Sequence, residues 1–278
     1  MNTNTLRKFS QSAFTRTELL AVLAALGVIA MLVPAIFAWR RVEWDTQCKN
    51  NLRKLSGALQ SYVQSSGEFP MFETWEVVDG KTNVWFWYYT LESKMVASDQ
   101  HPPKRFAQRT LGDTPWDCPA FTHNRAVYLS YGYNTLGLVS ASGQPPLGLG
   151  GKFLAPEQGR MSAVPVKEGD VVNPSSMLAL GDGVAGWNER LVSCGILSRA
   201  RFHEKALLSV PFNPSRHRGK INVAFVDGHV AALPITRLFS DTSDEALSMW
   251  NRDNQPHRER LYAEPVLRMG NLLELPRW

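Results

Sequence analysis

The chain has 278 residues and carries 30 basic and 25 acidic side chains, for a formal charge of +5. This length suits one core with a small satellite region, and the weak charge, without a basic stretch interleaved with aromatics, argues against a nucleic-acid partner. The cysteines are too few for a disulfide scaffold and form no C-x-x-C metal pair; they are Cys48, Cys118 and Cys194.

The N-terminal region predicts a membrane segment. Residues 1–13 are polar and basic, and residues 19–39 form an uncharged run of 21 residues. A helix of that length spans a hydrocarbon core of ~30 Å at ~1.5 Å per residue. A secretory signal peptide has a shorter apolar region, and residues 36–38 place a bulky side chain where cleavage needs a small one. A plain signal anchor remains an alternative, because Arg40 and Arg41 leave the charge distribution undecided.

The residues before the apolar run are A-F-T-R-T-E at positions 13–18. They resemble the type IV prepilin processing site, G/A-F-T-x-x-E followed by a long apolar run. The resemblance implies that a prepilin peptidase cuts between Ala13 and Phe14 and methylates the new amine of Phe14. It also implies that Glu18 pairs with the N-terminal amine of a neighbouring subunit, since an unpartnered carboxylate at the end of a membrane helix is costly. The alternative is that Glu18 only marks the polar boundary of an anchor helix.

The same helix is predicted to continue beyond the membrane, with a kink at Pro34. An apolar stripe with spacings of 4, 3, 4 and 3 indicates an amphipathic helix; its members are Cys48, Leu52, Leu55, Leu59 and Tyr62. The helix should stop near Ser66 and Gly67, ahead of Pro70. The predicted segments are a leader (1–13), a transmembrane half-helix (14–39), an amphipathic half-helix (40–66) and a globular domain (67–278).

The middle of the chain carries an aromatic segment at residues 82–95 that contains Trp85 and Trp87. It favours core packing under the long helix over a carbohydrate-binding platform. Composition predicts a surface loop at 142–151 and a short apolar strand at 176–180.

The strongest hairpin signal lies at 221–233, where Asp227 and Gly228 join two apolar runs and favour a type I′ turn. After it, Thr242 and Glu245 form a capping-box pattern that opens a short helix through Trp250.

A second resemblance covers most of the chain. His217 lies ten residues before Asp227 and Gly228, which gives H-x9-D-G. This resembles the C-terminal signature of the prepilin-type cleavage/methylation proteins. Further segments resemble that family in order: C-K-N-N-L at 48–52, C-P at 118–119, S-Y-G-Y-N at 130–134, the hairpin at 226–230 and W-N-R-D-N-Q-P-H at 250–257. The resemblance implies an α+β, pilin-like fold, in which a long kinked N-terminal helix packs on an antiparallel sheet with long loops.

The resemblance also implies a function. We expect a membrane-anchored pseudopilin-like or minor-pilin-like structural subunit of a type II secretion or type IV pilus-like envelope assembly. Its expected partners are the prepilin peptidase, other pilin or pseudopilin subunits and the inner membrane, which it crosses once with the globular domain on the periplasmic side. The alternative is an envelope-anchored binding module for polysaccharide or a secreted substrate.

An enzyme is not expected. Several side chains suit a metal chemically, but they show no recognised ligand spacing; they are His203, His217, Asp227, His229, Asp182 and His257. No cofactor is predicted. The resemblance allows a structural calcium, whose ligands the sequence does not identify.

Two side-chain pairs are also predicted, one between cysteines and one between a histidine and an aspartate. Cys48 lies on the membrane-distal helix and Cys118 on a proline-locked loop, so a disulfide is predicted if both face an oxidising space. Two reduced, buried thiols are the alternative. His217 and Asp227 are predicted to be structural partners that fix the hairpin, rather than a catalytic or metal-binding dyad with His229 as a third member.

Overall fold

A computed structural model of the chain describes residues 15–78, 81–95, 115–120, 130–138, 145–153, 163–183, 185–187, 190–192, 197, 199 and 216–262. The chain divides into two compact units, residues 1–43 and 44–278. The fold is a mixture of helices and antiparallel sheet, and the α+β class is therefore confirmed.

The first element is one continuous helix, α1 (Arg16–Ser66), which runs without a break through Pro34. It ends where the sequence predicted. Gly67 follows with φ 74°, and its N–H donates to the carbonyl of Val63 at 2.7 Å. This left-handed residue satisfies an orphan carbonyl of the last turn, and glycine adopts that conformation at little cost.

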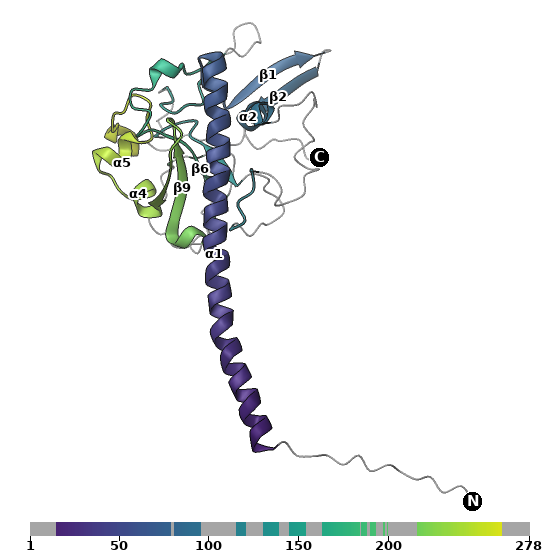
Figure 1. Cartoon of the computed structure of the whole chain (residues 1–278). Helices are drawn as coiled ribbons and strands as arrows, with labels where there is room; N and C mark the ends of the chain where they lie inside the picture. The colour runs from purple at the N-terminus through teal and green to yellow at the C-terminus, as the bar shows by residue number, and fades with distance from the viewer. Residues whose placement is uncertain are drawn as a thin grey trace, which may run out of the picture. The chain divides into compact units, whose positions relative to one another are not determined.

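The central sheet is antiparallel, with strand order β10-β9-β6-β3. Figure 1 labels its two middle strands, β6 and β9. Its strands are β3 (Tyr131–Tyr133), β6 (Leu178–Asp182), β9 (Lys220–Phe225) and β10 (Val230–Pro234). The predicted apolar strand and the predicted hairpin are both present in it.

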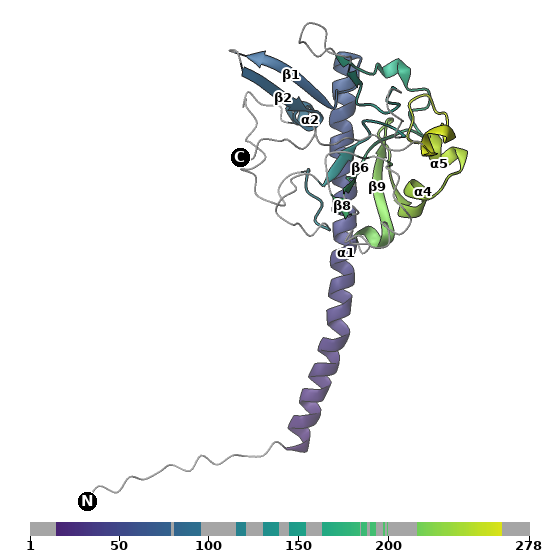
Figure 2. The ribbon, with the colours of Figure 1, turned by 180° about the vertical axis from the view of Figure 1, so that it is seen from behind.

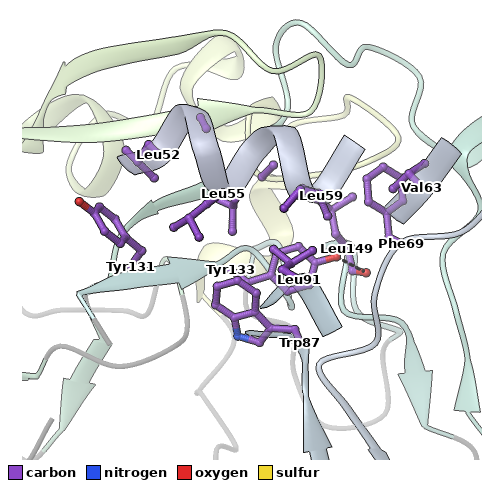
Figure 3. Close-up of a cluster of buried hydrophobic side chains, with 14 of the residues drawn as sticks. Leu52, Leu55, Leu59, Val63, Phe69, Trp87, Leu91, Tyr131, Tyr133 and Leu149 are labelled. Carbon is purple, nitrogen blue, oxygen red and sulfur yellow. Dashed lines mark hydrogen bonds between the residues drawn. The ribbon is translucent and has the colours of Figure 1, made fainter. Parts of the chain in front are cut away.

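The two faces of this sheet bury different partners. On one face, the apolar stripe of α1 packs with Ala224, Leu180 and the rings of Tyr131 and Tyr133 (Figure 3). On the other face, Val223 of β9 joins a second cluster with the short helices α4 (Ile235–Phe239) and α5 (Asp244–Ser248). Alternate strand residues point to opposite faces, so a sheet covered on both sides buries nearly every residue of its central strands.

The remaining elements are short. They are the hairpin β1 (Glu73–Val78) and β2 (Lys81–Phe86), the helix α2 (Trp87–Met95), the two-stranded pairs β4 (Lys152–Phe153) with β5 (Ala163–Val164) and β7 (Ala185–Trp187) with β8 (Arg190–Val192), and the 3-10 turns η2 (Glu168–Asp170), η3 (Arg216–Gly219) and η4 (Arg258–Tyr262). Figure 2 shows β1, β2 and α2 on the opposite side of the distal part of α1 from α4 and α5.

Three local predictions need correction. The β9–β10 turn is not type I′, because only Gly228 (φ 97°) has a positive φ; Phe225 and His229 pair across a three-residue loop, as in a type I turn with a bulge. Helix α5 is capped by Ser243, whose hydroxyl accepts from the Ala246 N–H, and not by Thr242.

The third correction concerns the predicted surface loop. Its described part, residues 145–151, is largely buried, with Leu147 and Leu149 in the interior. The glycines of this segment allow a close backbone approach, since a Cβ on Gly148 would lie 2.5 Å from the Gly137 nitrogen. A glycine-rich composition therefore marked tight packing here and not solvent exposure.

Candidate functional site

The first half of α1 exposes its apolar side chains. Its window Arg16–Val33 has a mean hydropathy of 2.0 and buries no residue, and it is the one helix in the described residues that could cross a membrane. The exposed apolar residues continue past that window to Ile36 and Trp39. By length and composition, this half-helix is suited to be a membrane anchor.

Glu18 lies in the first turn of this half-helix and closes a capping box. Its carboxylate accepts from the N–H and the hydroxyl of Thr15 at 2.8 and 2.9 Å, and the Thr15 hydroxyl accepts from the Glu18 N–H at 3.3 Å. The pair satisfies orphan donors of the helix start. Glu18 remains exposed, so its carboxylate is accessible to a further partner. Ala13 and Phe14, the predicted processing site, lie outside the described residues.

The second site is a buried cluster around a disulfide. Cys48 of α1 and Cys118 are bonded to each other, as predicted, with a Cα–Cα separation of 5.2 Å. Asn51 sits one turn further along α1 and donates its side-chain amide to the carbonyl of Asp117 at 2.8 Å. The helix and the loop are thus joined by a covalent bond and a neighbouring hydrogen bond.

His217 packs against this disulfide with its side chain only 1% exposed. Its Nε2 lies 3.3 Å from the Sγ of Cys118 and 3.5 Å from Oδ2 of Asp182, and its Nδ1 lies 3.0 Å from Oδ1 of Asp45. The contact with Asp45 is an ion pair by distance only, since Nδ1 lacks hydrogen-bond geometry toward any described residue. One imidazole therefore touches three elements that are far apart in the sequence.

Both carboxylates are held by the same strand residue. Asn222 of β9 donates its backbone N–H to Asp182 at 2.8 Å and its side-chain amide to Asp45 at 3.2 Å. Lys49 also donates to Asp45, at 2.6 Å. Burial alone would raise the pKa of Asp45, but the hydrogen bonds from Lys49 and Asn222 and the nearby positive charge of Lys49 and His217 hold this pKa below its usual value.

The predicted bond between His217 and Asp227 is wrong. The six residues of β9 separate them, and a strand of that length spans about 20 Å at ~3.3 Å per residue. His217 precedes the start of β9, whereas Asp227 lies in the turn after its end. The ten-residue spacing therefore places the two side chains at opposite ends of a strand.

Asp227 pairs instead with His229, two residues further along the chain. The Asp227 carboxylate lies 2.6 Å from the ring Nδ1 of His229 and accepts the His229 backbone N–H at 3.1 Å. The ring also stacks on Phe225, with centroids 4.1 Å apart. Asp227 therefore serves the loop between β9 and β10 and not His217.

The aromatic segment contributes to the core. Trp87 is fully buried, with its ring centroid 5.2 Å from Tyr133 and 5.7 Å from Trp116 (Figure 3). Trp85 is partly exposed, but its ring lies edge-on to Tyr89 with centroids 5.8 Å apart. The placement of Trp87 supports core packing, since this ring is not available to a carbohydrate.

Sequence reasoning missed Asp45 and Asn222 and gave Asp182 no specific partner. One signal was present for Asp182: it ends an apolar strand in G-D-G, where a charged residue is unusual unless it is paired. No such signal marks Asp45, which sits among polar residues on α1.

No protein-family model, curated protein or solved structure matches this chain. Its function is therefore inferred from its own residues and geometry. Two features carry most of the chemistry: the exposed apolar half of α1 with Glu18, and the cluster of Cys48, Cys118, His217, Asp45 and Asp182.

Proposed function

We propose that the chain is a membrane-anchored structural subunit of the pseudopilin or minor-pilin type, acting in a type II secretion-like or type IV pilus-like envelope assembly. The observation that carries this proposal is α1 itself. An exposed apolar half-helix, with Glu18 in its first turn, is continuous in backbone with the half-helix that forms the core of the second unit.

The exposed side chains explain why a membrane is needed. Leu23, Leu26 and Ile29 are each more than half exposed. Removing a side chain of this size from water contributes about 1.5–3 kcal/mol, so the whole surface strongly favours lipid or other apolar helices over water. A helix that is apolar on all sides cannot be covered by packing on one face of a domain.

Glu18 supports assembly rather than anchoring alone. The capping contact with Thr15 would serve any helix start, including that of a simple anchor. A carboxylate at the membrane end of a helix is nevertheless costly unless it also finds an opposite charge. The Thr15 cap holds this carboxylate in place and leaves it exposed. A new N-terminal amine on Phe14 of an adjacent subunit would supply the opposite charge and would fix the axial register of neighbouring helices.

The disulfide supports the location of the second unit. Cys48 and Cys118 are bonded, and disulfides persist in oxidising compartments such as the bacterial periplasm. We therefore place residues 44–278 on the periplasmic side of the inner membrane, with the prepilin peptidase and other pilin-like subunits as partners.

The test is site-specific photo-crosslinking from position 23 in membranes that contain the pilin-like subunits of the same cell. Wild type should crosslink to a pilin-like subunit or to a second copy of itself. Glu18→Ala should lose at least most of that product while staying in the membrane fraction. Glu43→Ala, which removes an exposed acidic residue of α1 away from the first turn, is the matched control. Equal crosslinking in both variants would contradict an assembly role for Glu18.

A further inference from the structure

The buried cluster contains a set of ligands typical of zinc. One ligand atom each from Cys48, Cys118 and His217 lies within 4.8 Å of the others, and all three residues are buried. Thiolate sulfur and imidazole nitrogen are the usual ligands of structural zinc. The two sulfurs are joined as a disulfide, so the set is closed to a metal in this state.

The spacing around His217 suits a tetrahedral ion. Ligands at usual zinc distances lie about 3.4–3.8 Å from one another in a tetrahedron. Nε2 of His217 lies 3.3 Å from the Cys118 sulfur and 3.5 Å from Oδ2 of Asp182, whose side chain is 0% exposed. Opening the disulfide to two thiolates frees both sulfurs beside the imidazole, and Asp182 is near this group through its contact with Nε2 of His217. The Asp182 carboxylate is not one of the mutually close ligand atoms, so it has to move toward the sulfurs to become the fourth ligand.

The other ring nitrogen of His217 lies within reach of a carboxylate, the group that orients many metal-bound histidines. Asp45 lies 3.0 Å from Nδ1, on the side of the ring away from the sulfurs, and Nδ1 has no hydrogen-bond partner in the described residues. Carboxylates in that position orient ligating histidines and leave Nε2 for the metal. The backbone is also strained, since His217 and Arg218 have φ of 51° and 56°. Such conformations are unfavourable for residues other than glycine and persist where the surrounding structure fixes them.

We propose that the disulfide is one state of a redox-switched zinc site, in which reduced Cys48 and Cys118 bind Zn²⁺ together with His217 Nε2 and Asp182. A dithiol reductant supplies two electrons and two protons, is itself oxidised to a disulfide, and converts the Cys48–Cys118 bond into two thiols. On binding Zn²⁺, the two thiols release two protons as thiolates.

The charge balance favours this exchange. Apart from His217, the proposed ligands carry one negative charge in the disulfide state, on Asp182. In the zinc state, two thiolates and Asp182 contribute three negative charges and Zn²⁺ contributes two positive charges, which again leaves one. The interior thus holds either state without a new uncompensated charge, whereas two free thiolates beside Asp182 would be strongly unfavourable.

The test uses the full chain in detergent with Cys194→Ser, so that only the two cluster thiols remain. Oxidised protein should bind no stoichiometric zinc, and protein reduced with a dithiol and then freed of reductant should bind one equivalent by elemental analysis. Co²⁺ in place of zinc should give a thiolate charge-transfer band and tetrahedral d–d bands. Absence of stoichiometric metal in the reduced protein would overturn the proposal.

Variants identify the ligands. Cys118→Ser should remove the contribution of one thiolate to the cobalt charge-transfer band. Asp45→Asn should weaken binding about 10–100-fold, as loss of an orienting carboxylate does elsewhere. His217→Cys should keep a ligand and shift the cobalt spectrum toward three sulfurs, which separates ligand loss from unfolding. His229→Ala, on the exposed turn, should change nothing. A cobalt spectrum identical in His217→Cys and the parent would also overturn the proposal.

Discussion

The two halves of α1 are both rich in apolar side chains, but only the second half buries them. Leu26 in the first half is 55% exposed, whereas Leu55 in the second half is fully buried. The first half is apolar on every side, while the second half concentrates its apolar residues in a stripe spaced by three and four. A stripe is satisfied by one domain face, and a helix apolar all round needs an apolar solvent or several helical neighbours.

The comparison also separates two kinds of contact. The second half is joined to its domain by covalent, apolar and polar contacts: the disulfide at Cys48, the stripe, and the ion pair of Asp45 with His217. In the first half, Glu18 makes its hydrogen bonds with Thr15 at the start of the helix. Mutations in the second half should therefore change stability, and mutations in the first half should change membrane behaviour.

The largest effect is expected from the disulfide. Cys48→Ser with Cys118→Ser removes a crosslink over a sequence separation of 70 residues. The chain-entropy model gives a loss of about 4–5 kcal/mol in the free energy of unfolding. For a domain of this size the melting temperature should fall by roughly 10–15 °C. Circular dichroism of the detergent-solubilised chain measures this, with Cys194→Ser as control; equal melting of the two proteins would refute the role assigned to the bridge.

A matched pair of leucines tests the comparison directly. Leu55→Ala should reduce the free energy of unfolding by about 2–5 kcal/mol, because it leaves a cavity in the core. Leu26→Ala should change it by less than about 0.5 kcal/mol, because the side chain has no core contact to lose. Urea titration in detergent compares them. Similar losses in both variants would show that the first half also packs on protein within the chain.

His217 should have an intermediate effect in the oxidised protein. His217→Ala leaves the buried Asp182 carboxylate without its neighbouring imidazole, and it should cost about 1–3 kcal/mol of stability. The control is His229→Ala, whose exposed pair with Asp227 contributes less than about 1 kcal/mol. Thermal melts of both variants decide the point. A larger loss from His229→Ala would mean that the hairpin turn, not the cluster, stabilises this region.

Two glycines, Gly57 inside α1 and Gly67 directly after its end, should respond to substitution in opposite directions. Both have open space for a Cβ, so only backbone conformation matters. Gly57→Ala lies inside the helix and should stabilise it by about 0.5–1 kcal/mol. Gly67→Ala, at φ 74°, should destabilise it by about 1–2 kcal/mol. Calorimetry of the two variants gives the signs, and stabilisation by Gly67→Ala would show that the helix end is not held in this conformation.

The sequence predicted those features that depend on local pattern. The stripe from Cys48 to Tyr62, the end of α1 at Ser66 and the β9–β10 hairpin each follow from spacing or from one glycine. The disulfide was also predicted, because Cys48 was expected on the membrane-distal part of the helix and Cys118 on a proline-locked loop, with an oxidising space around both as the assumption.

The sequence did not predict the buried cluster, because its members come from separate elements. Asp45 lies on α1, Asp182 ends β6 and His217 precedes β9, and no spacing connects them. The ten-residue separation instead suggested that His217 lies beside the turn that Asp227 starts. Only the sheet order β9-β6, with α1 across it, brings the imidazole between the two carboxylates.

The central claim is a processed, membrane-anchored subunit, and the intact mass of the protein extracted from membranes tests it most directly. Cells that contain a prepilin peptidase should yield a chain that lacks residues 1–13 and carries one additional methyl group on Phe14. The same protein from cells without that peptidase should keep the leader and remain in the membrane. A mature chain that retains Met1 in the presence of the peptidase, or that is cut after Ala38, would contradict the account and would leave a plain anchor or a signal peptide in its place.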